Sequence, residues 1–127
     1  MPRNDDLLRH LMLDLEQART VVTDQHAVPG HSRDEVAYHL ALILRSGWAE
    51  GVYRYPRSGP DSTVPQTILV RRLLPAGHDF LANVRDDDVW AKAKQVLGKV
   101  GGSASLEIVA QVITAIVRGT LGLGIIR

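Results

Sequence analysis

Histidine is the residue type in this chain best suited to metal binding or proton transfer, because the chain contains no cysteine. Two of the five histidines, His26 and His31, flank a Val28-Pro29-Gly30 turn and are spaced to share a metal ion. A protein metal site needs at least three side-chain ligands, and the spacing offers no third one. His39 falls within an apolar helical pattern, where we expect it to pack at the edge of the core. The sequence therefore predicts no metal site.

Acidic residues are the other candidates for chemistry. His78 and Asp79 resemble half of a catalytic pair, but no serine stands in a recognisable nucleophile turn. The carboxylates of Asp86-Asp87-Asp88 do not converge, because consecutive helical residues point about 100° apart. These acids suit the positive end of a helix instead. We therefore predict a protein that is not an enzyme and that holds no cofactor.

Arginine dominates the basic residues, with twelve arginines and three lysines. The formal net charge is only +1, so composition alone does not indicate a nucleic-acid binder. A genome rich in G and C would produce the same excess of arginine. Arginine nevertheless suits bidentate contacts with phosphate and guanine. Residues 31–72 contain six arginines and only four acidic residues. The six arginines are Arg33, Arg45, Arg54, Arg57, Arg71 and Arg72.

A helix over 32–46 is the best-marked element around these arginines. Ser32 and Glu35 have the spacing of a capping box, and Gly47 is placed to end the helix in a left-handed conformation. The apolar face is expected to consist of Val36, Leu40, Ile43 and Leu44. The opposite, exposed face is expected to carry Asp34, Ala37, Tyr38, Ala41 and Arg45.

A long β-hairpin is predicted after this helix. Residues 48–55 and 67–72 have extended patterns, and the breaker-rich segment 56–66 reads as the loop between them. A helix over 5–18 and a short β-branched segment over 20–23 come before. Helices over 75–85 and from 86 to about 97 come after the hairpin.

The last predicted helix, over 105–119, is apolar around most of its circumference. Such a helix must be covered on several sides, and a chain of 127 residues has few helices to cover it. We therefore expect a homodimer in which a second copy packs against this helix. The residues expected at that interface are Leu106, Val109, Ile113, Ile116 and Val117.

The order helix, small strand, helix, hairpin, helix is that of a winged helix-turn-helix. Residues 19–31 leave room for one helical turn at most, so the expected motif is degenerate. The predicted fold class is mainly α with a small β-hairpin (α+β), a winged helix-turn-helix-like domain with additional C-terminal helices. We expect a single domain over 1–127, with a winged-helix core at about 4–85 and a helical extension at about 86–120.

Two resemblances support this interpretation. His39-Leu40, Ile43 and Gly47-Trp48 resemble the recognition-helix segment of bacterial winged-helix regulators of the ArsR type. Three further segments resemble a bacterial and phage family catalogued as a domain of unknown function, DUF2513. They are Tyr38-His39-Leu40 to Gly51, Leu74 to Leu81, and Arg85 to Trp90. The family usually has a capping threonine where Leu74 stands. The resemblance implies a winged-helix-like fold with a helical C-terminal region.

We expect sequence-specific binding of double-stranded DNA in transcriptional control, with helix 32–46 in the major groove and a wing over 52–72. The residues expected to contact DNA are Arg33, Ala37, Tyr38, Ala41, Arg45, Arg54, Arg57, Arg71 and Arg72. The alternative is a protein-interaction module, such as an adaptor or an antitoxin-like partner of phage origin, on the same scaffold. Asp34 on the proposed DNA-facing side and Glu35 beside it oppose DNA binding, although acids at a helix start are expected for capping whatever the function.

Composition adds only broad limits. Apolar residues make up 45% and charged residues 23%, which is typical of a globular domain. The N-terminus lacks the pattern of a signal peptide, and no apolar run is long enough to span a bilayer. We therefore expect a cytoplasmic protein without a membrane partner.

Overall fold

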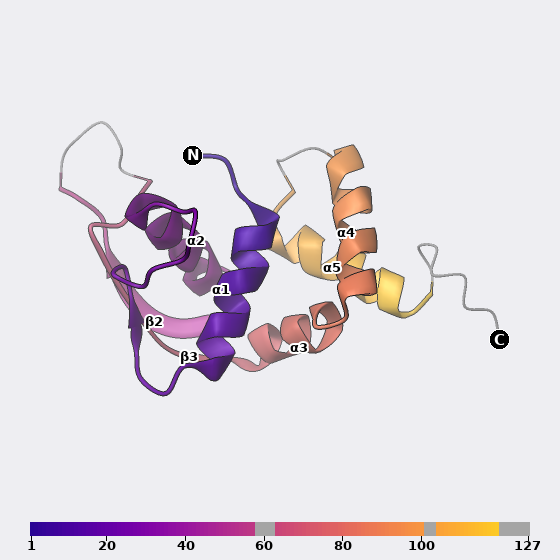
Figure 1. The fold of residues 1–127 in the computed structure, drawn as a ribbon, viewed down its shortest axis with the longest axis horizontal. Helices are drawn as coiled ribbons and strands as arrows, with labels where there is room; N and C mark the ends of the chain where they lie inside the picture. Colours follow the sequence, from indigo (N-terminus) through magenta and orange to yellow (C-terminus); the bar gives the residue numbers. More distant parts are fainter. Residues whose placement is uncertain (58–62, 101–103, 120–127) are drawn as a thin grey trace. The chain divides into compact units, whose positions relative to one another are not determined.

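The computed structural model describes residues 1–57, 63–100 and 104–119 and divides the chain into two compact units, Met1–His78 and Asp79–Arg127 (Figure 1). The described helices are α1 (Asp5–Gln17), α2 (Arg33–Arg45), α3 (Pro75–Val84), α4 (Asp87–Val100) and α5 (Leu106–Val117). The strands are β1 (Val22–Thr23), β2 (Ala49–Arg54) and β3 (Thr67–Leu73). The centre of the predicted hairpin loop, 58–62, and the predicted end of the helical extension at residue 120 lie outside the described residues.

Helix α1 begins where the sequence places it. The side-chain oxygen of Asn4 accepts a hydrogen bond from the Leu7 amide at 3.0 Å, and Asp5 and Asp6 occupy the first turn. One apolar face is buried, and it consists of Leu7, Leu8, Leu11, Met12 and Leu15. The predicted helix over 5–18 is confirmed to within one residue.

The three strands form one antiparallel sheet with the order β1-β3-β2. Strand β3 is central, and β2 is an edge strand that pairs only with β3 among the described residues. One face of the sheet is buried and carries Val22, Ile68 and Val70. The opposite face carries Val52 and Thr67 and is exposed. The predicted hairpin is therefore confirmed, and the segment around 20–23 adds a third strand to it.

A β-bulge interrupts the pairing of β2 with β3. Glu50 lies opposite Arg72, whereas Gly51 lies opposite Val70, so Arg71 is the extra residue in β3. A bulge lets two consecutive residues of one strand oppose a single residue of its neighbour. Both Arg71 and Arg72 are exposed.

Helix α2 has both of its predicted end signals. The Ser32 hydroxyl accepts from the Glu35 amide at 3.1 Å, and the Glu35 carboxylate accepts from the Ser32 amide at 2.9 Å. Gly47 has a φ of 76°, the left-handed conformation that glycine adopts without steric cost. The helix contacts α1 as well as β2 and β3 (Figure 1), so it is covered from two directions.

Helix α3 begins at Pro75 although Leu74 has no capping side chain. Proline lacks an amide hydrogen and has a φ suited to the first helical position, so the start costs little. The Leu74 amide donates to the Trp48 carbonyl oxygen at 2.9 Å. A Cβ on Gly77 would stand 2.1 Å from that same oxygen, so the close approach requires glycine.

Within the second unit, α4 and α5 pack against each other. The Asp86 carboxylate accepts hydrogen bonds from the amides of Asp88 at 2.8 Å and Val89 at 3.2 Å. This contact supports the interpretation of the aspartate run as a helix-start signal. Ser105 caps α5 by accepting from the Ile108 amide at 3.2 Å.

The architecture is α+β, as predicted. Residues 24–32, between β1 and α2, contain turns and no helix, in agreement with the single turn at most that the sequence allows. Within the described ranges, no helix is both long enough and apolar enough to cross a membrane.

Candidate nucleic-acid interface

Arg33, the first residue of α2, is engaged within the first unit. Its guanidinium donates to the Asp24 carboxylate at 3.1 and 3.3 Å, to Asp34 at 3.0 Å and to the Gln66 carbonyl oxygen. Burial alone would lower the pKa of Arg33, but the hydrogen bonds and charges of Asp34 and Asp24 raise it. Arg33 therefore joins α2 to the turn after β1 and to the start of β3.

Asp24 is a structural residue that the sequence pattern did not single out. Its backbone amide donates to the Ile68 carbonyl oxygen at 3.2 Å, and its carboxylate accepts from the Ile68 amide at 3.3 Å. Partial burial would raise the pKa of Asp24, but the hydrogen bonds from Ile68 and Arg33 and the charge of Arg33 lower it. The ionised side chain thus continues the β1–β3 pairing beyond the last residue of β1.

The structure corrects the predicted DNA contacts of Ala37 and Ala41. Both were expected on the exposed face of the helix, yet their relative exposures are 0% and 2%. The expectation assumed one covered face, whereas α1 and the sheet cover α2 from two directions. Small side chains at these positions permit close packing inside the protein and do not create room for a DNA groove.

The accessible part of α2 is a narrow ridge. Asp34 and Arg45 are exposed, and Tyr38 is partly exposed. The Tyr38 ring lies edge-on to the His39 ring, with 5.3 Å between the ring centroids. No ion pair joins Arg45 to another residue that the structure describes. Tyr38 and Arg45 are the two predicted α2 contacts that are at least partly exposed and that no described ion pair holds, whereas the partly exposed Arg33 is held by Asp24 and Asp34.

The hairpin presents its arginines differently. Arg54, Arg57, Arg71 and Arg72 are all exposed. Arg72 lies 3.3 Å from Glu50 in an ion pair whose side chains are 69% and 48% exposed, and such surface pairs are weak. Within the described ranges, the other three arginines form no ion pair. The four predicted wing arginines are therefore accessible to an anionic partner.

His39 is buried more deeply than the sequence suggests, with a relative exposure of 1%. Its Nδ1 lies 2.7 Å from the Glu35 carbonyl oxygen and must carry the proton, because that oxygen can only accept. Its Nε2 accepts a hydrogen bond from the Asn4 amide at 2.8 Å. Burial lowers the pKa of His39, so the ring is neutral and ties α2 to the start of α1.

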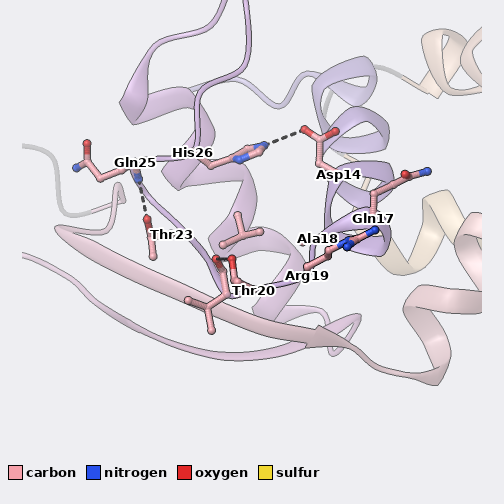
Figure 2. Close-up of a pocket in the computed structure, with 10 residues that line it drawn as sticks. Asp14, Gln17, Ala18, Arg19, Thr20, Thr23, Gln25 and His26 are labelled. Carbon is pink, nitrogen blue, oxygen red and sulfur yellow. Dashed lines mark hydrogen bonds and ion pairs between the residues drawn. The ribbon is translucent and has the colours of Figure 1, made fainter.

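Three further histidines of the first unit lie beside two carboxylates, His10 and His26 beside Asp14 and His31 beside Glu35. Figure 2 shows His26 pointing to Asp14 across one end of a groove of about 460 Å³, and Nε2 of His26 lies 2.8 Å from the Asp14 carboxylate. Nε2 of His10 lies 3.2 Å from that carboxylate, and His31 lies 3.4 Å from Glu35. His26 and His31 are thus held by different acids. Among the described residues, no cluster of three or more ligating side chains could hold a metal ion.

The residues predicted to form a homodimer interface are mostly covered within one chain. Leu106 is 5% exposed, and Val109, Ile113 and Ile116 are fully buried. Val117, with an exposure of 41%, is the one predicted interface residue that remains accessible. The expectation that a second copy must cover this face is wrong for the first four residues, because a single chain already buries them.

The first unit is thus a small helix-covered sheet with a basic hairpin, and the sequence comparisons place the chain in a family. It belongs to the family described as hypothetical protein (DUF2513), whose model matches residues 2–103. It is also similar to an uncharacterized protein of Haemophilus influenzae, with 30% identity over 121 residues that cover 92% of this chain and 96% of that protein. No solved structure matches the chain.

Proposed function

We propose that the Met1–His78 unit binds double-stranded DNA in transcriptional control, mainly through the β2–β3 hairpin. The observation that carries this proposal is the set of four exposed hairpin arginines, three of which have no ion-pair partner among the described residues. Phosphate contacts supply most of the non-specific affinity for DNA, and exposed arginines on a hairpin suit them.

The topology supports a winged-helix-like scaffold for this function. The elements follow the order α1, β1, α2, β2, β3, and the sheet has the order β1-β3-β2. In such a scaffold the hairpin serves as the wing. The helix that normally precedes the recognition helix is replaced here by the turns over 24–32.

Base-specific contacts, which would distinguish one DNA sequence from another, would come from the exposed ridge of α2. Arg45 is suited to guanine, and the Tyr38 ring is suited to a thymine methyl group. Asp34 stands on the same ridge and repels phosphate, so we expect the helix to add selectivity to an affinity that comes from the hairpin.

The test is binding to a fluorescent random-sequence duplex at about 50 and 200 mM salt, where each phosphate contact adds roughly one unit to the log–log salt slope. The decisive variant combines Arg57→Glu with Arg71→Glu, because these exposed side chains make no described ion pair. We expect its salt slope to fall by about two units and its affinity at low salt to fall at least tenfold.

The matched control combines Arg118→Glu with Lys99→Glu, two charge reversals at exposed cations of the second unit. It should leave both the affinity and the salt slope close to those of the wild type. An undetectable wild-type complex at low salt would overturn the proposal. An equal loss in the control and the hairpin variant would do the same, since it would reflect net charge alone.

A protein-interaction module is the second candidate, and one observation favours it. Val21, directly before β1, and Val52, in β2, are 48% and 54% exposed, and both could contact an apolar partner. This candidate gains support if DNA binding is absent while Val52→Ser and Val21→Ser both weaken a partner complex.

A further inference from the structure

Strand β2 leaves one edge of the sheet open. It pairs with β3 on one side, and no described strand pairs with it on the other. An edge strand presents unpaired amide and carbonyl groups that invite another strand, and proteins often block such edges with proline or lysine. Residues 49–54 contain neither of these, and Val52 and Tyr53 are exposed by 54% and 39%.

The sequence of β2 is complementary to itself when two copies run antiparallel. If Val52 lies opposite the partner's Val52, Glu50 lies opposite the partner's Arg54, and Arg54 opposite the partner's Glu50. Residues two apart share one face of a strand, so both charge pairs would flank a valine pair on the outer face. Sliding one strand by two residues removes both opposite-charge pairs, and sliding it by four brings Arg54 opposite the partner's Arg54 or Glu50 opposite the partner's Glu50, where like charges repel.

We propose that two copies of this chain associate through β2, antiparallel and centred on Val52, to form a continuous six-stranded sheet. Opposite-charge pairs directly across two strands stabilise the pairing, and the two-fold arrangement forms both at once. The Glu50–Arg72 contact within one copy does not prevent this, because a carboxylate has room for two guanidinium partners.

This interface differs from the one expected at α5, and it does not depend on DNA binding. A two-fold axis through Val52 runs perpendicular to the sheet, so the outer faces of the two copies lie on the same side. The exposed residues Arg54, Arg71 and Arg72 of both copies would then form one surface. A strand-edge contact buries little area, so we expect a reversible dimer of the size class below about 1,200 Å².

The first test uses the absence of cysteine in the chain. Val52→Cys should form a disulfide-linked dimer under mild oxidation, because cross-strand Cβ atoms at a two-fold axis lie within bridging distance. Val21→Cys, on β1's side of the sheet, is the matched control, since its exposure is similar. Val117→Cys reports on the α5 interface. Equal or faster cross-linking of either control variant would overturn the proposal.

The second test exchanges charges and measures mass by sedimentation up to about 1 mM protein. Glu50→Arg and Arg54→Glu should each be monomeric alone, because each places like charges opposite each other. A mixture of the two should regain the wild-type dimer, since every pair is again opposite in sign. A wild-type chain that stays monomeric at the highest concentration, or a mixture that stays monomeric, would show that β2 does not pair with itself.

Discussion

Helix α2 and the β2–β3 hairpin both carry arginine, but the arginine at the start of α2 is held in ion pairs whereas those on the hairpin are exposed. At the start of α2, Arg33 is held by Asp24, Asp34 and a backbone carbonyl. On the hairpin, Arg54 and Arg71 are exposed and make no described ion pair. The helix is covered from two directions, whereas the outer face of the sheet has no described helix covering it. The number of arginines in the sequence therefore overstates the accessible positive charge on α2, whereas on the hairpin each arginine does contribute to the accessible basic surface.

The difference follows from local chemistry. The first turn of a helix attracts carboxylates, because its free amides carry partial positive charge. Acids gathered there, such as Asp34, are within reach of any arginine in the same turn. A strand offers no such attraction, and the bulge at Arg71 places two arginines in succession on the exposed side. An arginine at a helix start is thus more readily held in ion pairs within the protein than an arginine on an exposed hairpin.

The largest expected effect concerns the side of α2 that carries Ala37, which is buried within the protein. Ala37→Arg should lower the free energy of unfolding by at least about 3 kcal/mol, because it forces a charged, bulky side chain into a packed site. Urea unfolding followed by far-ultraviolet circular dichroism measures the change. Gln17→Arg, at the exposed last residue of α1, is the control and should stay within about 0.5 kcal/mol of the wild type. A folded Ala37→Arg protein with wild-type stability would mean that this face of α2 is open after all.

A smaller effect separates the two kinds of arginine directly. Arg33→Ala removes hydrogen bonds to Asp24 and should cost about 1–2 kcal/mol at pH 7, whereas Arg71→Ala should change little. The folded-state pKa of Asp24 lies below its ordinary value of 3.8, so its pairing stabilises the fold above that pH. The stability difference between Arg33→Ala and wild type should therefore shrink as the pH falls through and below 3.8. Equal losses for both variants at pH 7 would contradict the distinction.

Much of the fold could be predicted from local signals. The capping box at Ser32 and Glu35, the left-handed Gly47 and the breaker-rich segment after β2 each depend on residues close in sequence. The start of α3 was predictable from Pro75 even without a capping residue at 74. Alternation along a strand is consistent with outward side chains at Arg54 and Arg72, whereas Arg71 is also exposed because of a bulge that the sequence did not indicate.

The errors arose where distant segments meet. Nothing within the sequence of α2 indicates that α1 covers the side occupied by Ala37 and Ala41, since alanine is compatible with both surface and core. Asp24 accepts a hydrogen bond from Ile68, which lies 44 positions away in the sequence, and local spacing gives no indication of that contact. The same holds for α5, where the sequence indicated that its apolar residues must be covered and did not show that a single chain buries Leu106, Val109, Ile113 and Ile116.

The smallest predicted effect concerns His39, which marks α2 as an internal element. Burial lowers the pKa of its imidazole below the ordinary 6.5, and Nε2 accepts from the Asn4 amide, so protonation would break that hydrogen bond. The unfolded chain takes up a proton near pH 6.5 and the folded chain does not, so stability is lost as the pH falls below that value. The loss is limited to about 1.4 kcal/mol for each unit by which the pKa is lowered.

The measurement compares urea unfolding of wild type and His39→Gln between pH 7.5 and pH 5, where the variant has no imidazole to titrate at this position. Wild type should lose more stability than the variant over this range, and the two should respond alike above pH 7. Nuclear magnetic resonance of the imidazole nitrogens gives an independent check, since the His39 ring should stay neutral as the pH falls below the ordinary imidazole pKa of 6.5. Identical pH slopes, or an imidazole that titrates like an exposed one, would mean that His39 is open to solvent. The same result would remove one of the contacts that set α2 apart from the hairpin.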